Sequence, residues 1–355
     1  MITPPLLHKG DKVEIVATAR KVTLSNITEG VEILQSWGLK VVFAENLFEE
    51  DNQFAGTDEI RAADLQKAIN DKEIKAIFYA RGGYGTVRII DRVDFSGLLE
   101  NPKWIIGFSD VTVIHNKMNN LGIESIHAPM MVTIADATPE SKNALRKILF
   151  GIDSETDEQQ GKCETISYTT TVETCKIPNR KGTATGEVVG GNLSILYSQI
   201  GSDSDIQTID KILFIEDLDE YLYHIDRMMM SLKRSGKLEH LKGLIVGAFT
   251  DMHDNTIPFG KTAEEIIMEA VKGYDYPVCF YMPFGHIRNN MPITLGRKVT
   301  MNVGDKEVNL KFEDKVAETD KKTQLKQFSV SVLWFTIFFV IALLLGLLAR
   351  YIINN

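Results

Sequence analysis

The sequence predicts an α/β protein in which a parallel sheet is covered by helices and is followed by a smaller α/β domain. Short apolar runs alternate with segments whose apolar residues repeat at helical spacing, an order typical of strand–helix–strand units. A polar stretch, rich in Thr, Glu, Gln and Lys, then separates two such series at 151–182. Close to the C-terminus an uncharged apolar run covers 328–349.

The first series predicts five strands, over 13–17, 41–43, 76–79, 104–108 and 124–127. Between them, helical spacing covers Ile27 to Gly38, residues 59–70 and the segment from Val111. In the second series we expect strands over 183–189, 211–215, 243–249 and 278–282, with helices from Asn192 and Leu218. We therefore predict an N-terminal nucleophile domain (1–150), a connecting region (151–182), a C-terminal domain (183–312), a polar linker (313–327) and a transmembrane helix (328–349).

The composition of the chain bears on its binding partners and on its cellular compartment. The 355 residues carry a formal net charge of −9 and no block of Lys and Arg interleaved with aromatic residues, so nucleic acid is not an expected partner. Cys163, Cys175 and Cys279 show no C-x-x-C spacing and form no disulfide framework, which favours a reducing compartment. The N-terminus also lacks the pattern of a secretory signal.

The run 328–349 predicts a membrane-spanning helix, because roughly 20 apolar residues suffice to cross a bilayer. Lys321, Lys322 and Lys326 precede it, whereas only Arg350 follows it. Positive charges favour the cytoplasmic side. We therefore expect a C-terminal membrane anchor with the catalytic domains facing the cytoplasm.

Ser109 lies where the apolar run 104–108 passes into helical spacing. At a sharp strand-to-helix turn a serine hydroxyl is exposed, and the free N–H groups of the first helical turn can stabilise an oxyanion beside it. Ser109 is thus a candidate nucleophile. The alternative is an N-cap serine that accepts hydrogen bonds from the same N–H groups.

A glycine-rich segment, 81–85, follows the predicted strand 76–79. Consecutive glycines let the backbone approach a ligand and direct N–H groups toward it, so the segment is a candidate oxyanion or carboxylate cradle. The alternative, and the more common role of such a segment, is an ordinary tight connection between a strand and a helix. Its spacing matches neither a dinucleotide fingerprint nor a P-loop, and no cofactor is expected.

Glu216 ends an apolar strand, and His286 lies in a glycine-flanked loop after another. With Ser109 they follow the chain order Ser, acid, His of hydrolases in which His activates Ser and the acid orients His. No metal site is expected, because no metal-binding spacing of His or Cys accompanies them.

Five blocks together resemble the LD-carboxypeptidase family over roughly 8–312: they are 81–85, 107–112, 190–193, 216–227 and 285–286. The resemblance implies a flavodoxin-like N-terminal domain, similar to class I glutamine amidotransferases, a serine peptidase of the muramoyltetrapeptide carboxypeptidase type, and a possible homodimer. One turn departs from the family pattern, since Ala17-Thr18-Ala19-Arg20 stands where Ala-Pro-Ala-Gly is usual.

By this resemblance Ser109 is the nucleophile, His286 the general base and then acid, and Glu216 the residue that orients His286. The backbone N–H groups of Gly83 and Asp110 would form the oxyanion hole. The candidate substrate contacts are Gly82, as a less favoured second N–H donor, and Arg81 or Arg288, as partners of the terminal carboxylate.

The expected function is removal of the terminal D-alanine from murein tetrapeptides in peptidoglycan recycling. One alternative resembles the microcin C immunity peptidases, which hydrolyse peptidyl or aminoacyl nucleotides and stack an aromatic residue of the connecting region on the base. The predicted connecting region holds Tyr168 as its one aromatic residue. The other alternative is a non-catalytic, membrane-tethered peptide-binding protein.

Overall fold

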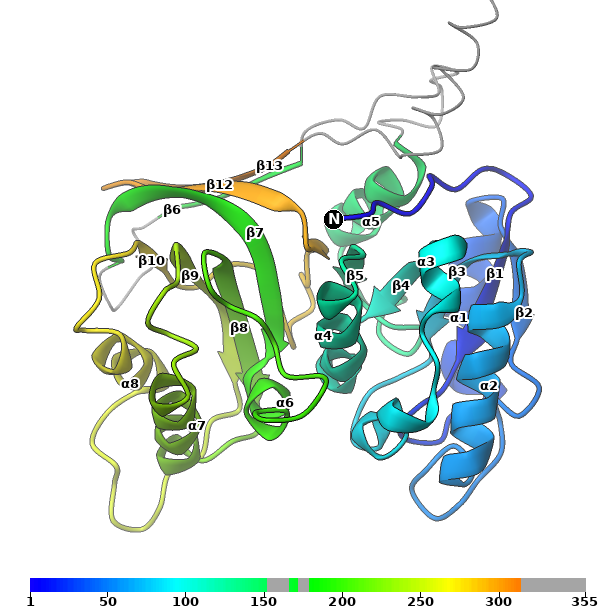
Figure 1. The fold of residues 1–355 in the computed structure, drawn as a ribbon, viewed down its shortest axis with the longest axis horizontal. Helices are drawn as coiled ribbons and strands as arrows, with labels where there is room; N and C mark the ends of the chain where they lie inside the picture. The colour runs from blue at the N-terminus through cyan, green and yellow to red at the C-terminus, as the bar shows by residue number, and fades with distance from the viewer. Residues whose placement is uncertain (152–165, 172–178, 314–355) are drawn as a thin grey trace, which may run out of the picture. The chain divides into compact units, whose positions relative to one another are not determined.

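A computed structural model describes residues 1–151, 166–171 and 179–313. All of them belong to one compact unit, 1–315. Within it the strands form two sheets, and the helices pack on and between them (Figure 1).

The first sheet has the strand order β11-β5-β4-β3-β1-β2. Its strands β1 to β5 are parallel, whereas β11 runs antiparallel to β5. The helices that belong to this sheet's part of the structure, here called the first half, connect its parallel strands. The bounds are β1 Lys12–Val16, α1 Leu24–Ser36, β2 Lys40–Phe43, α2 Asp58–Asn70, β3 Ile74–Tyr79, the 3₁₀ turns η1 Thr86–Arg88 and η2 Ile90–Arg92, α3 Gly97–Glu100, β4 Trp104–Gly107, η3 Ser109–Val111, α4 Thr112–Asn120, β5 Ser125–His127, α5 Pro139–Phe150 and β11 Ile293–Leu295.

The second sheet has the strand order β10-β9-β8-β7-β12-β13-β6. Strands β7 to β10 are parallel, and β12, β13 and β6 add an antiparallel part. Helices α7 and α8 pack against each other beside this sheet (Figure 1). The bounds are β6 Ser167–Thr171, β7 Gly182–Asn192, α6 Leu193–Ser198, β8 Ile212–Leu218, α7 Leu222–Arg234, β9 Gly243–Thr250, α8 Ala263–Ala270, β10 Val278–Cys279, β12 Lys298–Val303 and β13 Glu307–Phe312.

Strand β8 shows why the sequences of the central strands are apolar at successive positions. Successive side chains point to opposite faces of a sheet. Leu213 and Ile215 lie in the core beneath α6, α7 and α8, whereas Ile212 and Phe214 lie in the core shared with β11, β12 and β13. A strand covered on both faces has no polar alternation.

Helix α4 joins the two halves, because it packs against β5, β7 and α6 (Figure 1). At its first residue the Thr112 hydroxyl accepts a hydrogen bond of 3.0 Å from the Asn192 backbone N–H at the end of β7. The turn that carries Ser109 is therefore held against the strand that neighbours β8.

Two predictions about the fold are corrected. The first sheet, which was predicted to be parallel, is mixed, because β11, distant in sequence, pairs antiparallel with β5. The second sheet is mixed as well, and it includes β6, from the predicted connecting region, which pairs with β13. The predicted transmembrane helix, and the membrane localisation based on it, are not supported. Among the described residues no helix is long and apolar enough to span a bilayer.

The helices of the described part have at most 13 residues. At 1.5 Å per residue this is about 20 Å, short of the roughly 30 Å of a hydrocarbon core. The run 328–349 lies outside the described residues, as does the predicted linker beyond Glu313.

Candidate active site

Ser109 lies between β4 and α4, in a backbone conformation that non-glycine residues rarely adopt. Its φ is +64°, in the left-handed region, and strain of this kind concentrates at functional sites. Its hydroxyl lies 3.0 Å from Nε2 of His286, and no backbone N–H donates to it among the hydrogen bonds of the described residues. The N-cap alternative is therefore not what the structure shows.

Glu216 is fully buried near the carboxyl end of β8. The register of β8 against β9 shifts between Ile215 and Asp217. The extra residue of this bulge lies in β9, so β8 keeps its regular alternation of side chains. Glu216 lies on the face of Ile212 and Phe214, whereas Asp217 lies on the opposite face and accepts hydrogen bonds from Asn192 and Ser194.

His286 connects the other two side chains. Its Nδ1 lies 2.6 Å from Oε2 of Glu216, and its Nε2 faces Ser109. The preceding Gly285 has φ +110°, and a β-carbon there would come within 2.7 Å of Oε2 of Glu216. Only glycine lets the loop approach the carboxylate so closely.

Electrostatics favour ionised Glu216 next to a basic His286. Burial raises the pKa of Glu216, but the charge of His286, its hydrogen bond to the carboxylate and the nearby imidazole of His127 outweigh burial and lower it. Burial lowers the pKa of His286, but the charge of Glu216, their hydrogen bond and the charge of Asp217 together raise it. The carboxylate thus stabilises an imidazolium, which His286 becomes when it takes a proton from Ser109.

His127 is a further residue of this site that its sequence context did not indicate. This histidine, at the end of β5, is fully buried. Its Nε2 lies 3.9 Å from Oε1 of Glu216, and neither atom has a hydrogen-bond partner in the described part of the chain. The rings of Phe108, Phe214 and His115 surround it. Its position at the carboxyl end of a strand of the first sheet was the signal that could have identified it.

The glycine-rich segment lies directly beside the candidate nucleophile. A β-carbon on Gly82 would come within 3.2 Å of the Ser109 hydroxyl oxygen. The carboxylate of Asp110 accepts a 2.9 Å hydrogen bond from the Thr86 N–H. The fully buried Arg61 donates to the carbonyl oxygens of Gly85 and Thr18. The loop is therefore held from both sides, against β4 and against the turn after β1.

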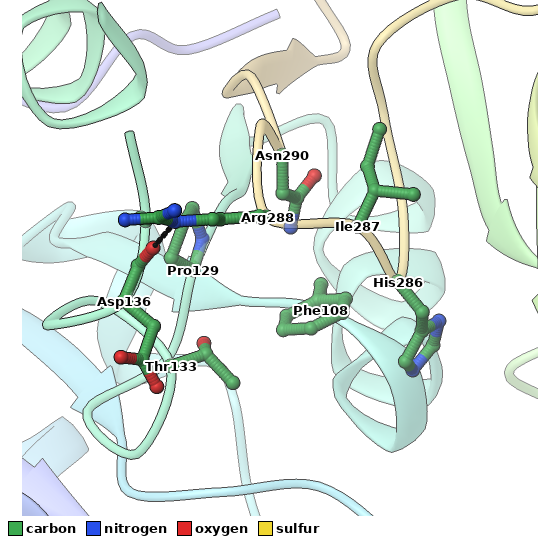
Figure 2. Close-up of a pocket in the computed structure, with 9 residues that line it drawn as sticks. Phe108, Pro129, Thr133, Asp136, His286, Ile287, Arg288 and Asn290 are labelled. Carbon is green, nitrogen blue, oxygen red and sulfur yellow. Dashed lines mark hydrogen bonds between the residues drawn. The ribbon is translucent and has the colours of Figure 1, made fainter. Parts of the chain in front are cut away.

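Arg288 and His286 line one pocket of about 690 Å³, together with Phe108, Thr133 and Asp136. Figure 2 shows the guanidinium of Arg288 lying over the Asp136 backbone, to whose oxygen Nε donates at 2.9 Å. Arg81 is half-buried, and Nη1 donates to the Lys21 carbonyl at 3.3 Å. The two candidate carboxylate-binding arginines therefore lie at different places, and Arg288 is the one that reaches this pocket.

Within residues 1–151, 166–171 and 179–313, no group of three or more His, Cys, Asp and Glu side chains could hold a metal ion. The Ser109, His286 and Glu216 hydrogen bonds have the connectivity of a serine hydrolase site. The fold and this site place the protein in the class of serine hydrolases, here built on two sheets with helices packed on and between them.

Comparison with known proteins narrows the class. The LD-carboxypeptidase N-terminal domain matches residues 13–128, and the LD-carboxypeptidase C-terminal domain matches 185–301. The chain therefore belongs to the LD-carboxypeptidase family and is a serine carboxypeptidase. The resemblance seen in its motifs is confirmed.

Three similar proteins illustrate the family. A probable murein peptide carboxypeptidase of Bacillus subtilis is 33% identical over 85% of this chain and 92% of its own. The microcin C7 self-immunity protein of Escherichia coli is 24% identical over 89% of this chain and 96% of its own. The crystal structure of the Oxalobacter formigenes muramoyltetrapeptide carboxypeptidase has a TM-score of 0.74 at 24% identity, covering 86% of this chain and 99% of that one.

Proposed function

We propose that this serine LD-carboxypeptidase releases the terminal D-alanine from murein tetrapeptides, with Ser109 as nucleophile, His286 as base and acid, and Glu216 as the residue that orients His286. The observation that carries the proposal is the continuous hydrogen-bonded series from Ser109 through His286 to Glu216, in a chain of this family. A murein peptide substrate is supported by the name of the B. subtilis relative.

In the first step the Ser109 hydroxyl oxygen attacks the carbonyl carbon before D-alanine, and its proton passes to Nε2 of His286. Glu216 accepts from Nδ1–H throughout, which keeps Nε2 available as the base. The C–N bond then breaks as Nε2 protonates the leaving amine, and D-alanine departs. Water repeats the sequence on the acyl-enzyme and restores the Ser109 hydroxyl.

The negative charge that develops on the carbonyl oxygen needs donors fixed in advance. We assign this role to the backbone N–H groups of Gly83 and Asp110. Thr86 and Arg61 support the assignment, because their hydrogen bonds to Asp110 and Gly85 hold this loop in place.

Mass spectrometry of murein fragments incubated with the full chain tests the substrate. Tetrapeptides should lose one alanine, and tripeptides should stay intact because they lack the D-alanine that the site releases. Intact tetrapeptides together with hydrolysed aminoacyl nucleotides would favour the microcin-type alternative. Binding of tetrapeptide without any turnover would favour a peptide-binding protein.

Tyr168 gives no support to the nucleotide alternative. It is 5% exposed, its hydroxyl donates to the Pro292 carbonyl, and its ring packs against Phe284 and Phe312. A ring held in this way is not available to stack on a base. The possible homodimer and the expected lack of nucleic-acid binding stay predictions.

The pH dependence of kcat/KM should show a base whose pKa is raised. His286 accepts a proton only when neutral, so activity should rise with pH through its pKa, above the ordinary value of about 6.5. Initial rates between pH 5 and 9 measure this rise in kcat/KM. Burial and the charge of Glu216 raise the pKa of Asp217 to about 7, so its charge, which helps to raise the pKa of His286, is only partly present over this range. Asp217→Asn should therefore move this rise to lower pH by a small amount. A profile that is flat over this range would contradict His286 as the base.

A further inference from the structure

Two arginines, Arg20 and Arg81, approach the glycine-rich loop beside Ser109. Arg20 ends the segment Ala17-Thr18-Ala19-Arg20 that follows β1. A β-carbon on Gly83 would come within 2.7 Å of Cδ and 2.9 Å of Nε of Arg20. A β-carbon on the neighbouring Gly82 would come within 3.2 Å of the Ser109 hydroxyl oxygen. The Gly82–Gly83 dipeptide therefore contacts the nucleophile through one residue and Arg20 through the next.

These two guanidinium groups lack an acidic partner in the part of the chain that the structure describes. Arg81 donates to the Lys21 carbonyl, and neither Arg20 nor Arg81 forms an ion pair there. Other arginines of the same half are paired: Arg61 and Arg88 with Asp58, and Arg92 with Glu59. Arg20 and Arg81 differ from these three arginines in having no carboxylate partner among the described residues.

The charges of the pair also repel each other. Burial, and then the nearby charge of Arg20, lower the pKa of Arg81, although a guanidinium stays protonated at neutral pH. Two like charges without a counter-ion are unfavourable, and an anion placed between them relieves the repulsion. The guanidinium fork matches a carboxylate in shape and can bind it through two hydrogen bonds.

We propose that Arg20 and Arg81 bind the free α-carboxylate of the residue that the enzyme releases. This inference rests on the proposed function. In a peptide that ends in D-alanine, the carboxylate carbon is three bonds from the carbonyl carbon that Ser109 attacks, through the C–N, N–Cα and Cα–C bonds. An anion site one residue along the loop from Gly82 fits that short separation. It also explains a preference for chain ends, because the residue after the scissile bond carries a free α-carboxylate only when it is the last one.

The test compares two substrates in two proteins. One substrate is the tetrapeptide with a free D-alanine carboxylate, and the other is the same peptide ending in D-alanine amide. Arg20→Met should lower kcat/KM for the free acid by about 10–100-fold, the range for losing a hydrogen bond to a charged group, and change the amide by less than about 3-fold. Arg20→Lys should keep part of the discrimination. Equal losses on both substrates, or none on either, would overturn the proposal.

Arg92→Met is the matched control, since Arg92 is an arginine of the same half that pairs with Glu59 away from the loop. It should change neither rate. Calorimetric binding of the free-acid tetrapeptide to Ser109→Ala protein, with and without Arg20→Met, provides a readout that needs no turnover. Wild-type protein that cleaves neither peptide would contradict the proposed function. A free-acid preference in binding that disappears with Arg20→Met would still support the carboxylate site.

Discussion

Ser109→Ala should reduce kcat by on the order of 10⁶, the loss that follows removal of the nucleophile from a serine hydrolase. The hydroxyl oxygen is the one atom of this residue that faces Nε2 of His286, and alanine keeps everything else. Release of D-alanine from a tetrapeptide, followed with a stopped assay sensitive enough for very slow turnover, measures the loss.

Two controls accompany this variant. Ser36→Ala changes a serine at the end of α1 and should keep wild-type turnover. Treatment with EDTA should also leave the wild-type rate unchanged, because no step of the proposed reaction uses a metal. Activity that chelation removes and zinc restores, or Ser109→Ala protein with more than a few per cent of wild-type turnover, would contradict the serine mechanism.

Glu216→Gln should reduce kcat by about 10⁴, which is less than the loss in Ser109→Ala. The glutamine amide removes the charge that stabilises imidazolium, and its NH₂ group can face Nδ1 as a donor. The imidazole would then carry its proton on Nε2, where it cannot accept one from Ser109. The same D-alanine assay, run beside Ser109→Ala, gives the order of the two losses.

Asp217→Asn is the matched control for Glu216→Gln. The two carboxylates are adjacent in β8 and both buried, but Asp217 accepts from Asn192 and Ser194 rather than from His286. We expect Asp217→Asn to lose far less activity. A larger loss in Asp217→Asn than in Glu216→Gln would mean that the wrong carboxylate has been assigned to His286.

Local patterns were enough for much of the fold. Strands β1, β3 and β4 were predicted to within two residues at each end, because their apolar runs are bounded by turn residues and their neighbours show helical spacing. The antiparallel strands β6, β11, β12 and β13 were not predicted. Strands β6 and β11 are short and pair with strands far away in the sequence, and no local pattern encodes such a partner. The predicted membrane span was the one element inferred from hydropathy alone, and it is not supported among the described residues.

The candidate site, like the fold, could be predicted only in part from local patterns. Ser109 could be proposed because a serine at a strand-to-helix turn is a local feature. His127 and Arg61 could not, because their importance comes from burial beside Glu216 and beside the Gly85 carbonyl, and one sequence does not show which polar residues are buried. Arg20 was noticed as a departure from the family pattern, but the sequence does not show that it approaches Gly83.

The sequence by itself determined the family, the order Ser109, Glu216, His286 and the alternation of strands and helices, because each depends on residue type and short spacing. Only the tertiary structure decided that Ser109 and His286, 177 residues apart, lie within 3.0 Å. It also decided which of Glu216 and Asp217 meets His286. Side chains alternate between the two faces of a strand, so Glu216 and Asp217 lie on opposite faces of β8, and only the packing of the sheet shows which face meets the His286 loop. That packing brings together segments that are far apart in the sequence, and no local pattern encodes it.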